Sequence, residues 1–396
     1  MDFELLEEQT MAIDSLRRCV ETEILPLVDG KTDTAFAPDL AHEIMRKLNP
    51  YGIGAGWLPE DGGGMGLDYV TSGLLYMELS RLLPDASGLA YVSEGAAMKI
   101  YRQGSTEQKE RYLPGMAEGR LIGCGAVTEP GTGSNVRQLR TRAERHGSGW
   151  RLNGEKMFIS NATVADVATV LARTGENEFT IFLLDRSEHA FQSREIEKLG
   201  MNGWSFGSIV MEDVYVDDAF RLGETGRALK EAMSGFERAR AWVAVIAAGV
   251  ARRALDDAIA YACERDQFGV PIASHQLVQG LLSDMACETE AIELMTCKSL
   301  AALDKGGRAD LPTSMAKAYC AEAAIRVASK GIQVHGAYGV TREYPMERHL
   351  RNARMLTIPD GTTQINQLIV GRELTGISAF LGAAGSRPRP QAQAAE

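Results

Sequence analysis

The chain has 396 residues, of which 45% are hydrophobic and 24% are charged, which is ordinary globular composition. A chain of this length is expected to form two or three domains with a large buried core. The formal net charge of −11 argues against a nucleic-acid partner, because binding to phosphate backbones depends on clustered lysine and arginine.

The six cysteines are scattered and form no C-x-x-C pair. Neither a metal site nor a disulfide framework is therefore expected, and a reducing compartment is the simpler interpretation. The first residues are acidic and amphipathic and lack the basic and apolar regions of a secretory signal. No run of about 18 apolar residues occurs, so no membrane span is expected. These features together predict a soluble cytoplasmic protein.

Residues 1–120 are predicted to form an N-terminal helical domain. Apolar residues recur at helical spacing over 39–48 and 71–82, and the glycine-rich segment 60–68 separates these two runs. Ser105 begins a segment, STEQK, with the pattern of a capped helix start.

Residues 121–227 are predicted to form a middle β domain. The short runs in this stretch are β-branched or alternate between apolar and polar residues, and turn residues separate them. The runs that we assign to strands are 150–152, 167–172, 179–184 and 208–214.

The helical period returns at about residue 228 and predicts a C-terminal helical domain over 228–380. Its long helices are expected at 236–264, 277–303 and 313–335, and Gly306 with Gly307 should end the second of them. The tail 381–396 is poor in apolar residues and is expected to be disordered. The order of domains is helical, β, helical, which makes the fold class α+β.

Several loop motifs have plain structural interpretations when each is taken alone. The segment that begins at Gly131, GTGSN, completes neither the dinucleotide-binding pattern nor the Walker pattern. The segment that begins at Arg265, RDQFG, reads as a helix end with a basic residue near the negative end of the helix dipole. His335 alone would most often be a satisfied or exposed histidine.

Taken together, in order and spacing, these segments closely resemble the acyl-CoA dehydrogenase family. The resemblance runs from about residue 3 to 377, and although each motif is weak, the ordered set is highly specific. Its motifs are PEDGGGMGLD at 59–68, VTEPGTGSN at 127–135, LNGEKMFISN at 152–161, FERAR at 236–240, ERDQFGVPI at 264–272, HQLVQ at 275–279, QVHGAYGVTREYPMER at 333–348 and IPDGTTQI at 358–365.

The resemblance implies an N-terminal helical domain, a middle β-barrel or sandwich and a C-terminal four-helix bundle. It implies a homotetramer that binds FAD at subunit interfaces, acts on an acyl-CoA and passes electrons to an electron-transferring flavoprotein. The implied FAD contacts are Thr128, Ser134, Phe158, Ile159, Ser160, Arg265, Gln267, Phe268, Gln333, Gly336, Thr362 and Gln364. Arg265 would reach the FAD pyrophosphate of a neighbouring subunit, a role that suits a bidentate guanidinium. Ser134 would also contact the substrate, and Arg240 would help to hold CoA.

The resemblance also implies that a carboxylate removes the α-proton, and here the sequence departs from the common pattern. Most members of the family have a glutamate where this chain has Asp360, and another branch has its glutamate where this chain has Ala239. Asp360 is therefore the candidate base, with Pro359 before it as a sign of a reshaped loop. Members that act on alicyclic thioesters such as cyclohexanecarboxyl-CoA also use aspartate. A ring substrate and a tolerated change on a straight or branched chain remain equal alternatives.

Three further positions depart from the family pattern. Ala337 replaces the second glycine of a common pair, and Asn352 replaces an aspartate. Glu94 lies where an uncharged residue often lines the acyl pocket. It is a candidate for binding a polar acyl substituent or for a second base, although such residues are more often solvated or salt-bridged.

Three other functions remain open. The acyl group could be carried by a phosphopantetheine arm on a carrier protein, because that arm makes the same thioester. The chain could instead be a flavin oxidase of the nitroalkane-oxidase type, because those relatives also use aspartate at this position. Arg240 and the ordinary family motifs favour a CoA thioester. An inactive member that only binds FAD or a partner is the third alternative, and Asp360 argues against it.

Overall fold

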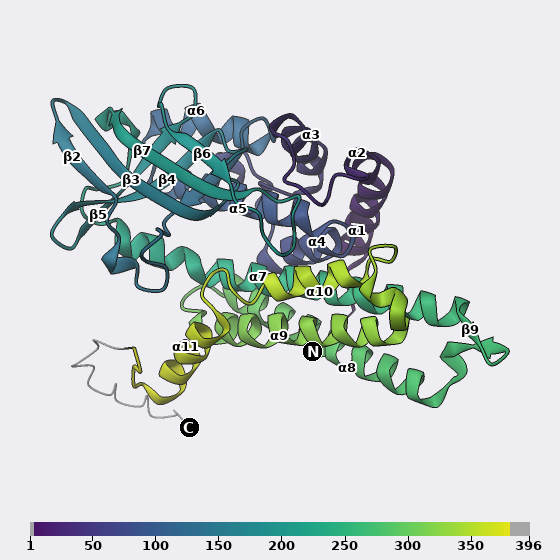
Figure 1. Cartoon of the computed structure of the whole chain (residues 1–396). Coiled ribbons are helices and arrows are strands. Elements are labelled where there is room, and N and C mark those ends of the chain that lie inside the picture. Colours follow the sequence, from purple (N-terminus) through teal and green to yellow (C-terminus); the bar gives the residue numbers. More distant parts are fainter. Residues whose placement is uncertain (1–3, 381–396) are drawn as a thin grey trace. The chain divides into compact units, whose positions relative to one another are not determined.

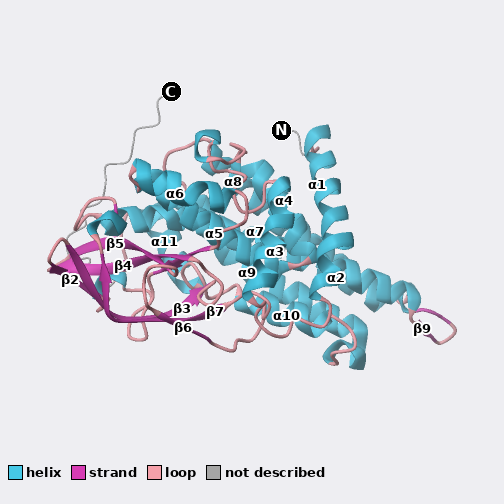
Figure 2. Ribbon diagram, turned by 90° about the horizontal axis from the view of Figure 1, so that it is seen from above, coloured by secondary structure: helices cyan, strands magenta, loops and turns pink. Residues whose placement is uncertain are grey.

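The structure, a computed structural model, describes residues 4–380, without the side chains of residues 230–234. Figures 1 and 2 draw its helices and strands. The chain divides into two compact units, Met1–Phe236 and Glu237–Glu396. Every strand of the large sheet lies between Gly123 and Leu222, and helices come before and after it along the chain. The predicted order of helical, β and helical parts is therefore confirmed, as is the α+β class. The tail predicted to be disordered, 381–396, lies outside the described residues.

The first unit begins with helices, several of which start at residues with clear capping chemistry. The Ser105 side chain accepts a hydrogen bond from the Gln108 amide at 3.2 Å, and the Gln108 side chain accepts one from the Ser105 amide at 3.0 Å. This reciprocal capping starts a helix where the sequence predicts one. Asp68 caps another helix through the amide of Thr71. The helices are α1 (Glu7–Cys19), α2 (Leu25–Val28), α3 (Pro38–Leu48), α4 (Tyr69–Leu82), α5 (Pro84–Gln103) and α6 (Thr106–Ala117).

An eight-stranded sheet follows these helices in the first unit. Its hydrogen-bonded order is β6-β7-β3-β2-β4-β5-β8, and β1 pairs in parallel with β4. The strands are β1 (Gly123–Ala126), β2 (Arg142–His146), β3 (Gly149–Ser160), β4 (Val167–Gly175), β5 (Glu178–Asp185), β6 (Gln192–Glu195), β7 (Phe206–Val216) and β8 (Arg221–Leu222). Each of the four predicted strand runs lies within one of these strands.

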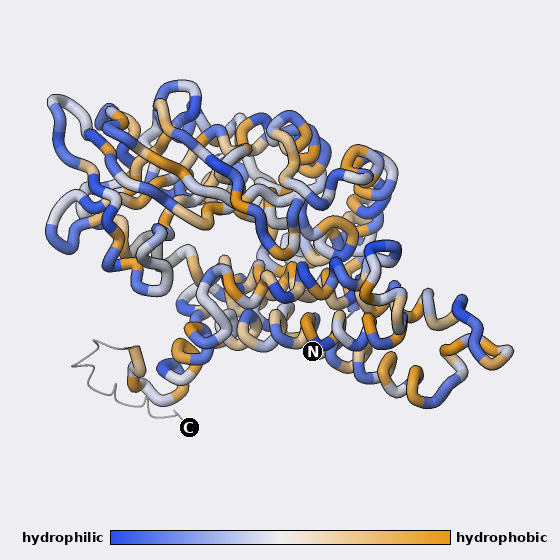
Figure 3. Tube along the Cα trace, in the orientation of Figure 1, coloured by the Kyte–Doolittle hydropathy of each residue, from blue (hydrophilic) through white to orange (hydrophobic). Residues whose placement is uncertain are grey.

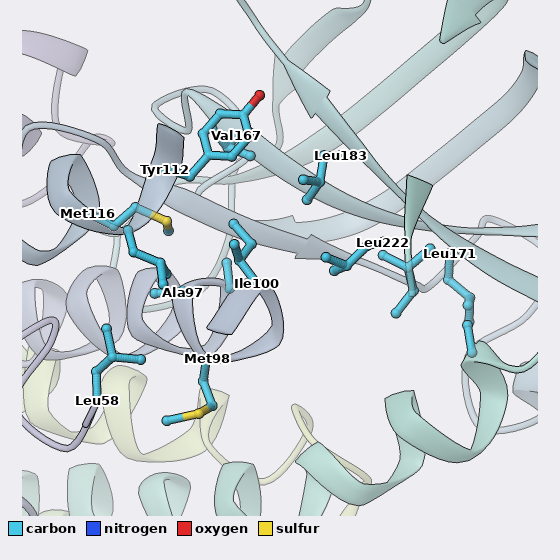
Figure 4. Close-up of a cluster of buried hydrophobic side chains, with 14 of the residues drawn as sticks. Leu58, Ala97, Met98, Ile100, Tyr112, Met116, Val167, Leu171, Leu183 and Leu222 are labelled. Carbon is cyan, nitrogen blue, oxygen red and sulfur yellow. The ribbon is translucent and has the colours of Figure 1, made fainter. Parts of the chain in front are cut away.

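A hydrophobic core joins the sheet to the helices of the first unit, and Figure 4 draws part of it. Ile100 of α5 and Tyr112 of α6 share this cluster with Val167 and Leu171 of β4 and with Leu183 of β5. Burial of side chains of this size stabilises the fold by about 1.5–3 kcal/mol each. The packing fixes β1, which runs beside β4, and so sets the starting point of the loop that leaves the sheet after Ala126.

Over residues 237–380, the described part of the second unit, the regular structure is helical apart from one short hairpin. Its helices in Figure 3 carry bands of hydrophobic and hydrophilic residues, the pattern expected when one face of a helix is buried. Gly306 and Gly307 have φ of +70° and +79° and follow the end of the second long helix, as predicted. The elements are α7 (Ala228–Glu264, which begins in the first unit), β9 (Asp266–Gln267), β10 (Val270–Pro271), α8 (Gln276–Asp304), α9 (Asp310–His335), α10 (Met346–Met355) and α11 (Thr363–Thr375). Within residues 4–380, no helix is both long enough and apolar enough to cross a membrane.

Candidate active site

The loop after β1 is anchored to β3 by a buried ion pair. Lys156 is 0% exposed, and its Nζ donates to Glu129 Oε1 at 2.9 Å and to the Val127 carbonyl at 3.0 Å. Burial lowers the pKa of Lys156 to about 8, although Glu129 opposes this shift. Burial alone would raise the pKa of Glu129, but the Arg140 amide and the Lys156 ammonium lower it overall. The pair therefore holds Thr128, which lies between Val127 and Glu129, in a fixed place.

The anchored loop is open along its glycine-rich part. A Cβ atom added to Gly131 would meet no atom within 4 Å, and one added to Gly133 would meet only the Thr128 methyl group at 3.9 Å. Thr128 is half-buried and Ser134 is exposed. The Thr128 carbonyl accepts the Met157 amide at 2.9 Å, so this loop and the end of β3 lie side by side. The first unit thus brings together the residues that sequence resemblance assigns to the flavin at 128–134 and at 158–160.

The end of β3 is irregular. The register between β3 and β7 shifts between Lys156 and Ile159, and Phe158 there has a φ of +62°. This bulge leaves the Phe158 ring 50% exposed and stacked on Phe206, with 5.7 Å between ring centroids. The Ile159 side chain points the other way, into the core, and is 3% exposed. Phe158 can therefore present its side chain to a ligand, whereas Ile159 can present only its backbone.

Asn161, which sequence reasoning did not select, fixes the end of this strand. It is fully buried with a φ of +64°. Its Nδ2 donates to the carbonyls of Leu89 and Gly123, at 2.9 and 3.1 Å, and its Oδ1 accepts from Trp204 Nε1 at 2.9 Å. The only sequence signal was an asparagine directly after a strand, a residue that tolerates left-handed backbone.

Glu94 of α5 is buried in the first unit with 0% exposure. Its Oε2 accepts from the Tyr76 hydroxyl at 2.8 Å, and its Oε1 accepts from the Trp57 amide at 3.3 Å. The Tyr76 oxygen in turn accepts the Gly54 amide at 2.9 Å. Both carboxylate oxygens therefore have partners within the protein, and the group ties α4 and α5 to the segment before the 59–68 loop.

The Arg265 segment forms a hairpin at the end of α7. Phe268 and Gly269 connect β9 to β10 with φ of +57° and +79°, as a two-residue turn with left-handed backbone requires. The Phe268 ring is 95% exposed, and Leu277 of α8 is 87% exposed. The Arg265 guanidinium lies over the Tyr338 ring, 5.9 Å from its centroid. The hairpin therefore presents apolar surface together with a cation and a neighbouring aromatic ring.

The α9 terminus forms the second implied flavin segment of this unit. Gly336 has a φ of +60°, and a Cβ atom there would meet nothing within 4 Å, while Gln333 is exposed. His335 is buried, its ring stacks on Tyr261 at 4.1 Å, and its Nδ1 pairs with the Gly331 carbonyl at 2.9 Å. Burial lowers the pKa of His335. This histidine is a satisfied structural residue, which agrees with the plain interpretation of the sequence.

Asp360 lies on the short loop between α10 and α11. Its φ is +53°, and that of Gly361 is +91°. Thr362 caps α11 by accepting the Ile365 amide at 3.3 Å, and Gln364 in the first turn is exposed. The side chain of Asn366 donates to the carbonyls of Gly361 and Thr362, at 2.8 and 3.1 Å. The backbone around Asp360 is therefore held in an uncommon conformation by hydrogen bonds on its C-terminal side.

Arg240 is buried and bound within the second unit. It is 5% exposed, and its Nη2 donates to Asp310 Oδ1 at 2.6 Å. Burial lowers its pKa, against the opposing charges of Asp310, Glu237 and Asp360. Among the described residues its Nε has no hydrogen-bond partner. Arg240 is therefore paired with Asp310 through one nitrogen, and its buried Nε is a donor that another group can use.

Lys317 of α9 is a further buried cation near Asp360 that sequence reasoning missed. Its Nζ donates to the Thr357 carbonyl at 2.8 Å, and Asp360 is one of the two carboxylates whose charges act on it. The signal for burial was present, because Lys317 falls at helical spacing with the small and apolar residues Cys320 and Ala324. The second unit thus brings Arg240, Lys317 and Asp360 together.

Each unit, taken by itself, carries residues whose chemistry suits a flavin. The open loop at Gly131 and the open Gly336 leave room for close approach of a cofactor, as glycine permits. Phe158 offers an exposed ring on a fixed bulge, and Arg265 offers a cation. Within residues 4–380, no cluster of histidine, cysteine, aspartate or glutamate has the composition of a metal site.

Comparison with known families and proteins gives consistent matches along the chain. The N-terminal, middle and C-terminal domain families of acyl-CoA dehydrogenase match residues 6–120, 124–214 and 226–375. The probable acyl-CoA dehydrogenase YngJ of Bacillus subtilis is 33% identical, over 94% of this chain and 100% of its own. A cyclohex-1-ene-1-carbonyl-CoA dehydrogenase of Syntrophus aciditrophicus is 32% identical, over 94% of this chain and 91% of its own.

Among solved structures, a glutaryl-CoA dehydrogenase from Mycobacterium smegmatis in complex with FADH2 superposes with a TM-score of 0.87. It is 33% identical, and the match covers 95% of this chain and 96% of that one. Fold, site and matches together define an FAD-dependent oxidoreductase that acts on the CH–CH bond of acyl-CoA thioesters. The chain belongs to the acyl-CoA dehydrogenase family.

Proposed function

We propose that the protein removes two hydrogens from the α and β carbons of an acyl-CoA thioester, with Asp360 as the base that takes the α-proton. The observation that carries this proposal is the loop of Asp360, which Asn366 and Lys317 hold in left-handed backbone. The charge of its carboxylate also acts on two buried cations, Arg240 and Lys317. A general base must be ionised before it reacts, and nearby positive charge favours that form. The alternative position for a family base is occupied by Ala239, which has no titratable group.

The flavin would supply the chemistry of hydride acceptance when bound. The chain would hold it through Thr128, Ser134 and the strand end 158–160 of the first unit. From the second unit, the implied contacts are Arg265, Gln267, Phe268, Gln333, Gly336, Thr362 and Gln364. Arg265 suits the pyrophosphate because a guanidinium binds phosphate bidentately and keeps its charge.

A ring-shaped acyl group is our preferred substrate. Aspartate is one methylene shorter than glutamate, and a displacement of about 1 Å at a reacting atom can reduce a rate about 10²-fold. A competent aspartate therefore requires a loop or a substrate shifted to meet it, and a substituted α-carbon in a ring would supply such a shift. The match to the Syntrophus aciditrophicus protein, whose name specifies a cyclohexene thioester, supports this choice.

Glu94 shapes the fold near the acyl pocket in this proposal and does not act as a second base. Its two oxygens already accept hydrogen bonds from Tyr76 and Trp57, so a substrate group would have to displace a partner. Arg240, with its remaining Nε donor, is the proposed contact to the CoA part of the substrate.

The exposed apolar hairpin at 265–271 supports a proposed assembly. Phe268 is 95% exposed on this hairpin, and Leu277 at the start of α8 is 87% exposed. Exposed apolar surface of this kind can mark a protein–protein contact. We propose a homotetramer in which this hairpin binds a neighbouring subunit and its FAD. An electron-transferring flavoprotein is the proposed electron acceptor.

An anaerobic titration tests the proposed function. The purified yellow protein would be mixed with straight-chain, branched and cyclohexanecarboxyl-CoA thioesters, and the flavin absorbance would be followed. The proposal expects bleaching by CoA thioesters, with the ring substrate reacting at the lowest concentration. Bleaching only by thioesters of a carrier protein, or rapid oxygen consumption with a nitroalkane, would replace it with one of the other functions.

A further inference from the structure

A buried lysine fastens the loop that carries Asp360. Lys317 is 0% exposed, and its Nζ donates to the Thr357 carbonyl at 2.8 Å. The Thr363 amide donates to the same oxygen at 3.1 Å. The carbonyl of Thr357 therefore closes the loop 357–363 on itself and also ties it to α9.

The tie acts on a loop that needs support. Asp360 and Gly361 are consecutive residues with positive φ, and a residue with a side chain persists in that region only when its surroundings hold it there. Asn366 holds the C-terminal side of the loop through the carbonyls of Gly361 and Thr362. Lys317 is the matching tie on the N-terminal side.

A buried lysine is an energetically unfavourable donor to a carbonyl, because the ammonium group loses its hydration when it is buried. Burial lowers the pKa of Lys317 to about 8, while the charges of Asp360 and Glu322 raise it. The ammonium therefore remains largely protonated near neutral pH. Electrostatic coupling is reciprocal, so the ammonium favours the ionised carboxylate of Asp360 as strongly as that carboxylate favours the ammonium.

Other charged groups surround this pair. Arg240 of α7 also feels the charge of Asp360, and Arg354 of α10 donates to the Thr357 hydroxyl. Glu322, one turn along α9, accepts from the Thr363 hydroxyl at 2.8 Å. Arg240 is the second cation near Asp360, so loss of Lys317 should weaken the positive field there and not abolish it.

We propose that Lys317 is a positioning residue for the reaction: from α9 it fixes the backbone of the loop that carries Asp360 and places a positive charge beside that loop. This inference rests on the proposed role of Asp360 as base. It adds a second requirement, that a fully buried residue of α9 holds the loop of the base in place.

The test is anaerobic stopped-flow flavin reduction by saturating cyclohexanecarboxyl-CoA and by butyryl-CoA across a range of pH, with FAD-loaded protein. Lys317→Met should retain FAD and bind thioester nearly as wild type does, because Lys317 is fully buried and paired with the Thr357 carbonyl. Its limiting reduction rate should fall about 10–100-fold, the cost of a displacement approaching 1 Å. The acid limb of its rate profile should move to higher pH, which a purely structural role would not cause. Lys330→Met, on the same helix but paired with Glu288 of α8, is the matched control and should behave as wild type.

Lys317→Gln separates the effect of the hydrogen bond to Thr357 from the effect of the positive charge. It also replaces Lys317→Met in this test if the methionine variant loses its FAD. A glutamine amide can still donate to the Thr357 carbonyl but carries no charge, so its acid limb should move while more of its limiting rate survives. If either Lys317 variant, loaded with FAD, has the same dependence of reduction rate on pH as wild type, the inference is overturned. Asp360→Asn distinguishes the two proposals: if it loses reduction while the Lys317 variants do not, only the role of Lys317 is wrong. If Asp360→Asn keeps wild-type reduction, the base itself is misassigned.

Discussion

Replacing Lys156 by methionine should destabilise the first unit and loosen the loop that carries Thr128. The ammonium binds Glu129 Oε1 at 2.9 Å and the Val127 carbonyl at 3.0 Å, and the two charged side chains are 0% and 5% exposed. Methionine fills a similar volume but removes the charge and both hydrogen bonds. The Glu129 carboxylate would remain buried, with the amides of Arg140 at 2.5 Å and Thr141 at 2.9 Å as its remaining partners.

Breaking a buried ion pair by removing one partner costs about 3–5 kcal/mol, because the other charge stays buried. A unit of about this size loses about 2–4 °C in melting temperature for each kcal/mol. Lys156→Met should therefore melt at least about 6 °C below wild type. FAD should be released at a lower temperature as well, because the affected loop carries Thr128 and Ser134.

The assay is thermal unfolding followed by circular dichroism, together with flavin fluorescence to report release of FAD. Lys47→Met is the matched control, because Lys47 binds Glu23 at the same 2.9 Å with side chains that are 29% and 51% exposed. Exposed pairs contribute little, so that variant should melt close to wild type. Equal melting temperatures for the two variants would refute the reasoning, since both substitutions break a lysine–glutamate pair of the same length, and the Lys156 pair is buried and has an added hydrogen bond to the Val127 carbonyl.

Three other predictions concern the hairpin, the base and the pH dependence of stability. Arg265→Ala should weaken FAD retention and oligomerisation together in gel filtration with absorbance detection, and FAD held as tightly as in wild type would contradict the interface. Under the proposed ring substrate, Asp360→Glu should lower activity on the natural substrate, because one added methylene would displace the carboxylate by about 1 Å; equal or higher activity on straight-chain thioesters would remove the support for a ring substrate. The hydrogen bond to Asp166 raises the pKa of His42, so their pair stabilises fully below the ordinary histidine pKa of about 6.5 and loses this effect as pH rises through the raised value. His42→Gln should therefore lower the urea midpoint more at about pH 5.5 than at about pH 8.5, and an equal loss at both would contradict the assignment.

Local chemistry was enough to predict much of the fold. Ser105 starts α6 because capping is decided by residues three positions apart, and the short run at 167–172 forms β4 because it is rich in the β-branched residues Val and Thr. Gly306 and Gly307 end α8 because their positive φ excludes most other residues. In each case the information lies within a few residues of the element it determines.

The details of the site depended on contacts between distant residues, which local patterns do not encode. Lys156 lies at alternate positions from Trp150 and Leu152, but nothing near it in the sequence indicates that Glu129 would be its partner. The same holds for Lys317 and the carbonyl of Thr357, forty residues along the chain. A lysine on an apolar face often extends its charge to solvent, so burial of the charge itself could not be predicted.

Glu94 is another residue whose environment local sequence patterns did not predict. The sequence indicated that an acidic residue there is most often solvated or salt-bridged, yet the structure buries it fully with hydrogen bonds from Tyr76 and Trp57. These two partners come from α4 and from the segment before the 59–68 loop, and only the folded chain brings them to α5. A role for Glu94 in selecting the acyl group stays a prediction, which the anaerobic titration with different thioesters tests.

The rate of flavin reduction by Asp360→Asn tests the proposed mechanism most directly. Asparagine keeps the size of the side chain and its place on the loop but cannot accept the α-proton. The variant should bind FAD and thioester, and its anaerobic reduction rate at saturating thioester should fall about 10²–10⁴-fold, the usual contribution of a general base. Reduction at the wild-type rate would contradict the account and move the base elsewhere, with Glu94 the next residue to replace.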